Sequence, residues 1–167
     1  LNPLVINRSG SFTISGNISG AADVVLKGGA TVTLNGVNNT YSGATTVSNG
    51  TLIVNGTNAT SSTHVYVGGL GNGGTFIIGP VTLESGTAIV ANGSVGPQTI
   101  TSDFTNDSSS MVFEINKLAS PANDSVSVSG TLARNVTGGT LRVKNLGPNN
   151  LVPGDKFTLF SQPLPNG

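Results

Sequence analysis

Short β-prone runs separated by tight glycine-containing turns fill the stretch from Asn38 to Gly56. Its sequence, NNTYSGATTVSNGTLIVNG, places one Ser-Gly pair and two Asn-Gly pairs after successive runs, so a turn recurs every six or seven residues. The stretch has no helical spacing of apolar residues. A chain that turns this often is predicted to wind as a β-solenoid rather than to form a sheet covered by helices.

Apolar residues alternate, wholly or partly, with small polar or charged residues in several other windows. These windows are Ser11–Ser15, Thr31–Asn35, Thr51–Asn55, Met111–Ile115, Ser125–Ser129 and Lys156–Phe160. Each window can therefore form a strand with one buried and one exposed face. No window of comparable length carries an apolar stripe at helical spacing, so we expect almost no helix.

Two all-β architectures could use the many Asn-Gly and Gly-Gly turns: an antiparallel β-sandwich or a parallel β-helix. The strands are short and evenly spaced, and each is followed by a further corner, which favours a parallel β-helix, with the sandwich as the alternative. Composition divides the chain into regular rungs over residues 1–93, a polar irregular rung or hinge over 94–110, and a continuation of the solenoid over 111–167. We expect one domain, or one segment of a longer solenoid.

The low charge of the chain limits the classes of partner that it is expected to bind. Seven Lys and Arg residues balance seven Asp and Glu residues, and charged residues make up 8% of the chain, against about 25% in an ordinary soluble domain. No basic run provides a surface for nucleic acid or anionic lipid. Cysteine is absent, and no apolar run approaches the roughly 20 residues that span a bilayer. We therefore predict no nucleic-acid partner and no direct membrane insertion by this segment.

No residue pattern points to catalysis, to a cofactor or to a metal. Asp103 and Asp107 are close in sequence but lie in the most polar segment, so burial of an acid and base pair there is not expected. Asp124 and Asp155 adjoin turns, where aspartate commonly caps the backbone. His64 is the only histidine and is interpreted as an exposed polar residue on a strand. No complete calcium-binding loop is present.

The segment from Tyr41 to Leu52, YSGATTVSNGTL, resembles the autotransporter-associated β-strand repeat, whose core runs approximately as Tyr-x-Gly-x-Thr-x-apolar-x-x-Gly-x-Leu. In the C-terminal part, NDSVSVSG from Asn123, GTL from Gly139 and PGDKFTLF from Pro153 are similar to the segment that closes such arrays. The resemblance implies a right-handed parallel β-helix in a large secreted or surface-displayed bacterial protein. It implies little about activity, because passengers of different function carry the repeat.

The resemblance also implies structural roles for individual positions. Glycine is expected at corners where a Cβ would clash or where the backbone is left-handed, and apolar residues are expected to stack from rung to rung. The predicted corner and core residues are Tyr41, Gly43, Val47, Gly50, Leu52, Val54 and Gly56.

We therefore expect a non-enzymatic, extracellular structural or adhesive module of a bacterial surface or secreted protein. A self-assembling fibre subunit is a related prediction, with an apolar N-terminal assembly arm formed by Leu1, Leu4, Val5 and Ile6. The expected partners are further copies of the chain, or host or environmental glycans. The alternative is a carbohydrate-binding or carbohydrate-active β-helix domain.

Overall fold

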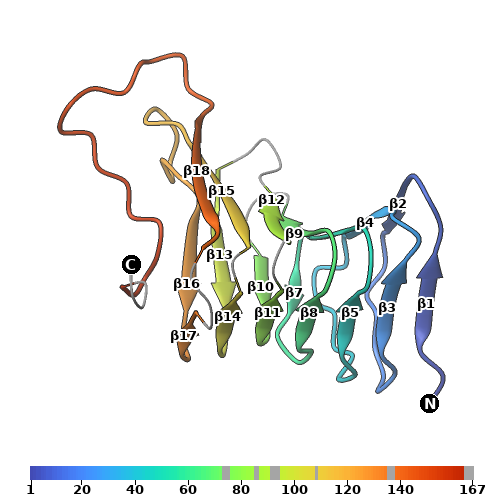
Figure 1. The fold of residues 1–167 in the computed structure, drawn as a ribbon. Coiled ribbons are helices and arrows are strands. Elements are labelled where there is room, and N and C mark those ends of the chain that lie inside the picture. The colour runs from blue at the N-terminus through green and yellow to red at the C-terminus, as the bar shows by residue number, and fades with distance from the viewer. Residues whose placement is uncertain (73–75, 85–86, 91–94, 108, 135–137, 164–167) are drawn as a thin grey trace.

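The computed structural model describes residues 1–167 except 73–75, 85–86, 91–94, 108, 135–137 and 164–167 (Figure 1). Within the described residues the chain forms eighteen strands and no helix. Every pair of neighbouring named strands is parallel. The predicted all-β parallel solenoid is confirmed. The sandwich alternative is wrong, because a sandwich would join its strands by antiparallel hairpins.

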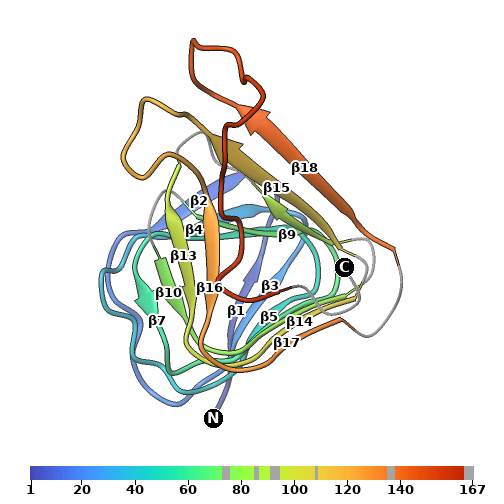
Figure 2. The ribbon, with the colours of Figure 1, turned by 90° about the vertical axis from the view of Figure 1, so that its left-hand side faces the viewer.

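The strands stack into three parallel sheets, which we call A, B and C. Sheet A consists of β1 (Leu4–Asn7), β3 (Val24–Lys27), β5 (Thr45–Val47), β8 (Thr63–Val65), β11 (Val81–Leu83), β14 (Phe104–Asn106) and β17 (Leu132–Ala133). Sheet B consists of β2 (Ser11–Ile14), β4 (Thr31–Leu34), β6 (Thr51–Val54), β9 (Gly69–Asn72), β12 (Ala88–Val90), β15 (Ser110–Ile115) and β18 (Thr140–Asn145). Sheet C consists of β7 (Thr57–Asn58), β10 (Phe76–Ile78), β13 (Pro97–Ile100) and β16 (Ser125–Val128). Viewed close to the solenoid axis, the three sheets enclose a common interior (Figure 2).

The last two coils of sheet A contain more residues than the coils before them. The first coil of sheet A advances 20 residues, from Leu4 to its register partner Val24. The sixth advances 28 residues, from Phe104 to Leu132. Part of the extra length is the excursion between β15 and β16, which turns back so that Ile115 and Asn123 form an antiparallel bridge. The coils therefore keep their strand register while their connections lengthen.

The hydrophobic core is built from identical positions of successive coils. Alternation along each strand sends every second side chain inward, and parallel in-register pairing stacks these side chains on their equivalents. One stack in sheet A contains Ile6, Leu26, Val47, Val65 and Leu83, all of which are buried. A stack in sheet B contains Val32, Leu52, Leu70, Ile89 and Met111, which are also buried. The interior is thus a continuous apolar column.

Five of the six windows predicted as strands coincide with β2, β4, β6, β15 and β16. The window Lys156–Phe160 is not a strand, and that prediction is wrong. Only Phe160 pairs there, as an isolated parallel bridge with Val126. Residues 97–100 and 104–106, within the segment predicted as an irregular rung or hinge, are the strands β13 and β14. The division of the chain into three segments stays a prediction.

The C-terminal segment continues sheet C beyond β16. Val126 N donates to Leu159 O at 2.8 Å, and Ser161 N donates to Val126 O at 3.0 Å. The Phe160 ring lies edge-on against Phe113, with 5.3 Å between ring centroids. This segment therefore occupies the place of a sheet C strand in the coil that begins with β17 and β18. No helix among the described residues is long and apolar enough to cross a membrane.

Candidate functional site

The glycines of the recognisable repeat lie where neighbouring coils approach most closely. A Cβ added to Gly43 would overlap the carbonyl group of Ala22, and one added to Gly50 would overlap the carbonyl oxygen of Ala30. Gly50 also has a φ of 113°, which favours glycine. A Cβ on Gly56 would lie 2.9 Å from the Cα of Val37. The structure thus places these three glycines against the backbone of the preceding coil.

The apolar residues predicted from the repeat lie in the core. Val47, Leu52 and Val54 are buried members of the interior cluster. Val54 pairs in register with Leu34, so its side chain continues a stack of sheet B. These three positions contribute packing and no accessible chemical group.

Tyr41 lies in the interior and anchors a buried polar network. Its Oη is 2.7 Å from Thr45 Oγ1 and accepts a hydrogen bond from Asn58 Nδ2 at 2.6 Å. Thr45 Oγ1 is in turn 2.8 Å from Ser61 Oγ, which donates to the carbonyl oxygen of Gly43 at 2.8 Å. All four side chains are buried. The network ties β5 to the corner that joins β7 and β8.

Burial raises the pKa of the Tyr41 hydroxyl above its ordinary value of 10.0, although the hydrogen bonds from Thr45, Ser61 and Asn58 oppose this shift. The phenol is therefore neutral at physiological pH and serves as a structural hydrogen-bonding group. Because the ring is fully buried, Tyr41 has no surface to offer to a sugar.

The predicted assembly arm is not a free segment. Leu4, Val5 and Ile6 belong to β1, which pairs along its length with β3. Ile6 is buried in the core, whereas Leu1, Leu4 and Val5 are exposed. β1 is the edge strand of sheet A, so its outer edge is available for pairing with another strand. Assembly through this edge stays a prediction.

The carboxyl groups of Glu114 and Asp124 are buried near one another. Asp124 Oδ2 accepts from Glu114 N at 2.7 Å, and its Oδ1 accepts from Gly96 N at 2.9 Å. Glu114 Oε1 accepts from Lys144 Nζ at 3.1 Å. Burial raises the pKa of Asp124, and the nearby Glu114 carboxylate adds to this shift, while the two backbone hydrogen bonds oppose it. Because both carboxyl groups are covered, no substrate can reach them, and their role in this geometry is structural.

Asp103 and Asp155 also bond to the backbone, whereas Asp107 is half-buried and its Oδ1 has no hydrogen-bond partner among the described residues. Asp103 Oδ1 accepts from Thr131 N of the next coil at 2.7 Å. Asp155 Oδ2 accepts from Val152 N at 2.9 Å and pairs with Lys117 Nζ at 3.1 Å. The backbone hydrogen bond and the lysine both hold the pKa of Asp155 below 3.8. Among the described residues, no group of three or more histidine and carboxylate side chains is placed to hold a metal ion.

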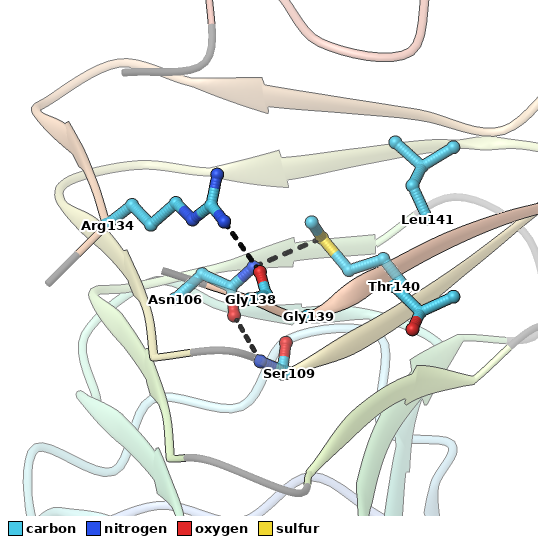
Figure 3. A pocket seen from close by; sticks show the side chains of 8 residues that line it. Asn106, Ser109, Arg134, Gly138, Gly139, Thr140 and Leu141 are labelled. Atoms are coloured by element: carbon cyan, nitrogen blue, oxygen red, sulfur yellow. Dashed lines mark hydrogen bonds between the residues drawn. The ribbon is translucent and has the colours of Figure 1, made fainter. Parts of the chain in front are cut away.

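A small cavity lies between the last two coils (Figure 3). Its volume is about 150 Å³. Figure 3 shows Asn106 accepting from Ser109 N at 2.9 Å and Arg134 donating to the Gly138 carbonyl at 2.7 Å. A cavity of this size accommodates a group as large as benzene. It is too small for an oligosaccharide.

A partly exposed cluster of polar and aromatic side chains lies on the outer face of sheet A. His64 Nε2 is 2.6 Å from Oε1 of Glu84, which directly follows the neighbouring strand β11. The Tyr66 ring stacks on the His64 ring, with centroids 4.0 Å apart and planes 11° from parallel. Tyr66 is 49% exposed. His64, predicted as an exposed residue, is half-buried between Tyr66 and Glu84.

The signal for this cluster is present in the sequence THVYV. His64 and Tyr66 are two positions apart, on either side of the buried Val65. Because side chains alternate between the two faces of a sheet, both project from the outer face. The contact with Glu84 depends on the register between coils, 20 residues apart in sequence. That register cannot be read from the segment itself.

Comparison with known proteins agrees with this architecture. The family described as Passenger-associated-transport-repeat matches residues 24–54, which span β3 to β6. The chain is 37% identical over 154 residues to the adhesin BmaC autotransporter of Brucella suis biovar 1 (strain 1330). This alignment includes 86% of the chain but only 4% of that relative, so the chain spans a small part of its length. No solved structure of another protein matches the chain significantly.

The repeat matched by the family includes Gly43, Val47 and Gly50, which lie at the corners and in the core described above. The resemblance noted in the sequence is thereby confirmed. Residues 24–54 carry a repeat of the passenger-associated transport repeat family, and the described residues form a parallel β-solenoid around it.

Proposed function

We propose that this chain is a non-enzymatic adhesive segment of an extracellular, surface-displayed or secreted bacterial protein. The observation that carries the proposal is the similarity to an autotransporter adhesin along 86% of the chain, on a solenoid of the same repeat family. Two features of the structure support it. The polar outer faces carry few charges, and the buried carboxylate pair is closed to substrates.

The proposal is tested with beads that carry the purified chain and are incubated with cultured animal epithelial cells. Beads coated with albumin at the same density are the control. Adhesive function predicts more attached beads per cell than albumin gives. Equal attachment on several cell types and on immobilised glycans would contradict the proposal.

We propose self-association as a second function, because apolar side chains are exposed at both ends of the solenoid. Leu4 and Val5 of β1 are exposed at the N-terminal end, and Leu141 and Val143 of β18 are exposed at the other end. Stacking one copy on another would cover both edges and continue the parallel sheets.

Sedimentation velocity over a range of protein concentrations tests this second function. Stacking predicts species larger than a monomer that grow with concentration, and Val5→Lys should reduce them, because a charge at a strand edge blocks pairing. A monomer at every concentration would contradict stacking through these ends.

A further inference from the structure

One aromatic ring on the outer face of sheet A is open to solvent and held in place. His64 stacks on one face of the Tyr66 ring, so the opposite face is the one left for a ligand, and Tyr66 as a whole is 49% exposed. By contrast, Tyr41, Phe104 and Phe113 are fully buried. We propose that Tyr66, His64 and Glu84 form a binding site for an uncharged pyranose sugar. This inference rests on the proposed adhesive function and names its ligand class.

The open face of Tyr66 suits the apolar face of a sugar ring. The π-system of an aromatic ring is negative on its face, and it attracts the weakly positive C–H groups that a pyranose presents on one side. The ring is positioned before any ligand arrives, because His64 stacks on it and is itself held by Glu84 at 2.6 Å. Such preorganisation reduces the entropy lost on binding.

Polar groups surround the ring at positions that sugar hydroxyls can reach. The Glu84 carboxylate accepts hydrogen bonds, and its side chain is 38% exposed. Ser48, which directly follows β5, holds the position in its coil that Tyr66 holds after β8, since Ser48 N bonds to Leu26 O and Tyr66 N bonds to Val47 O. Neighbouring strands lie about 4.8 Å apart, which is the scale of a single sugar ring. Carboxylate acceptors and hydroxyls together can bind the vicinal hydroxyls of one pyranose.

The charge of the site selects an uncharged ligand. Asp107 follows Glu84 in the same ladder, because Glu84 N bonds to Val65 O and Asp107 N bonds to Leu83 O. Two carboxylates on adjacent strands disfavour a sialylated or sulfated sugar. Lys27 lies two coils before Tyr66, on the side away from Glu84, at a distance of about 10 Å. At that distance, screening by salt weakens the attraction of Lys27 for an anionic sugar. The chain as a whole has no net charge that would favour an anionic ligand.

The experiment uses a glycan array with uncharged and sialylated glycans, followed by NMR titration of the chain with lactose and with cellobiose. Dense display on the array makes weak binding visible through multivalency. We expect retention on uncharged glycans and shifts of the Tyr66 ring signals on titration. Tyr66→Ala should weaken binding about tenfold or more, whereas Tyr66→Phe should keep most of it, because the ring face remains.

Two further variants make the test specific. Val67→Ala removes an adjacent exposed side chain and should leave binding unchanged. Glu84→Gln removes one negative charge and should allow sialylated glycans to bind better than they bind to the unsubstituted chain. Unfolding temperatures of all variants show that they remain folded.

Two results would overturn the sugar site: no shift of Tyr66 with either disaccharide and no retention on the array, or equal binding by the Tyr66→Ala variant. If the beads described above still attach to cells in that case, adhesion stands and does not use a sugar bound at Tyr66. If neither beads nor glycans bind, the adhesive function fails together with the sugar site.

Discussion

Tyr41 shows how a single residue of the repeat holds two coils together. Its hydroxyl is bonded to Thr45 and Asn58 inside the solenoid. Tyr41→Phe keeps the ring but leaves these buried groups without one partner, so we expect a loss of about 1–3 kcal/mol in the free energy of unfolding. Urea unfolding measures this loss, with Tyr66→Phe on the surface as the control. Equal stability of both variants would contradict the role of the network.

The same hydroxyl predicts a response to alkaline pH. Burial raises the pKa of Tyr41 in the folded state above 10.0, so the neutral phenol stabilises the fold. This stabilisation is complete below pH 10 and is lost as pH rises through the folded pKa. The unfolding temperature should therefore fall more steeply above pH 10 in the unsubstituted chain than in Tyr41→Phe. Parallel decline in the two proteins would show that Tyr41 does not contribute.

Two glycines with nearly the same backbone conformation separate backbone strain from crowding between coils. Gly20 and Gly68 have φ values of 108° and 110°, but a Cβ on Gly20 meets nothing within 4 Å, whereas one on Gly68 would overlap the carbonyl oxygen of Gly50. Gly20→Ala should cost roughly 1–2 kcal/mol from strain alone. Gly68→Ala should cost more or prevent folding. Similar unfolding temperatures for the two variants would contradict close packing at this corner.

The sequence predicts such corner residues better than it predicts surface clusters. Gly50 and Leu52 follow a local pattern of turn and alternation, so one segment suffices to place them. The contact between Tyr66, His64 and Glu84 depends on which residues of successive coils align. That alignment is set by the length of each connection, which no single segment reveals.

At the scale of elements, the segment around Phe160 completes sheet C in the final coil. Phe160 packs edge-on against the buried Phe113, and the backbone beside it pairs with β16. Phe160→Ala should lower stability by about 2 kcal/mol or more, because it uncovers Phe113. Hydrogen exchange should rise at the amides of Val126 and Val128 and stay unchanged in β3. Unchanged protection of β16 would contradict this pairing.

The turn at Asp155 is a second feature of the C-terminal segment. Val152 N and Lys117 both stabilise the Asp155 carboxylate, so its pKa is below 3.8 and its stabilising contribution is lost only as pH falls through that lower value. Carbon-13 NMR of the carboxyl group should give a midpoint below 3.8. Lys117→Met should raise the midpoint only in part, because the backbone hydrogen bond is the larger cause. A midpoint at or above 3.8 would contradict the described turn.

The strands β4, β6 and β16 could be predicted from the clear alternation of apolar and polar residues along them. Lys156–Phe160 has the same alternation yet is not a strand, because only Phe160 reaches an edge with which it can pair. The longest coils could not be predicted either. Their extra residues form excursions such as that between Ile115 and Asn123, which keep the sheet register unchanged.

The whole molecule is a stack of coils with an apolar interior and outer faces of low charge. Two lysine–carboxylate pairs and the His64–Glu84 contact join the described residues, so electrostatic attraction contributes little to the stack. Each coil contacts mainly its neighbours, which makes stability a sum of local terms. An adhesive surface on such a scaffold would act through hydrogen bonds and aromatic contacts rather than through charge.

Attachment of chain-coated beads under flow, compared at two salt concentrations, tests this account most directly. The two concentrations are about 0.15 M NaCl, which is near physiological, and about 1 M NaCl, which strongly screens charges. An adhesive solenoid of low charge predicts attachment above the albumin control and little change between the two salt concentrations. Attachment no greater than that of albumin, or attachment that disappears at high salt, would contradict the account.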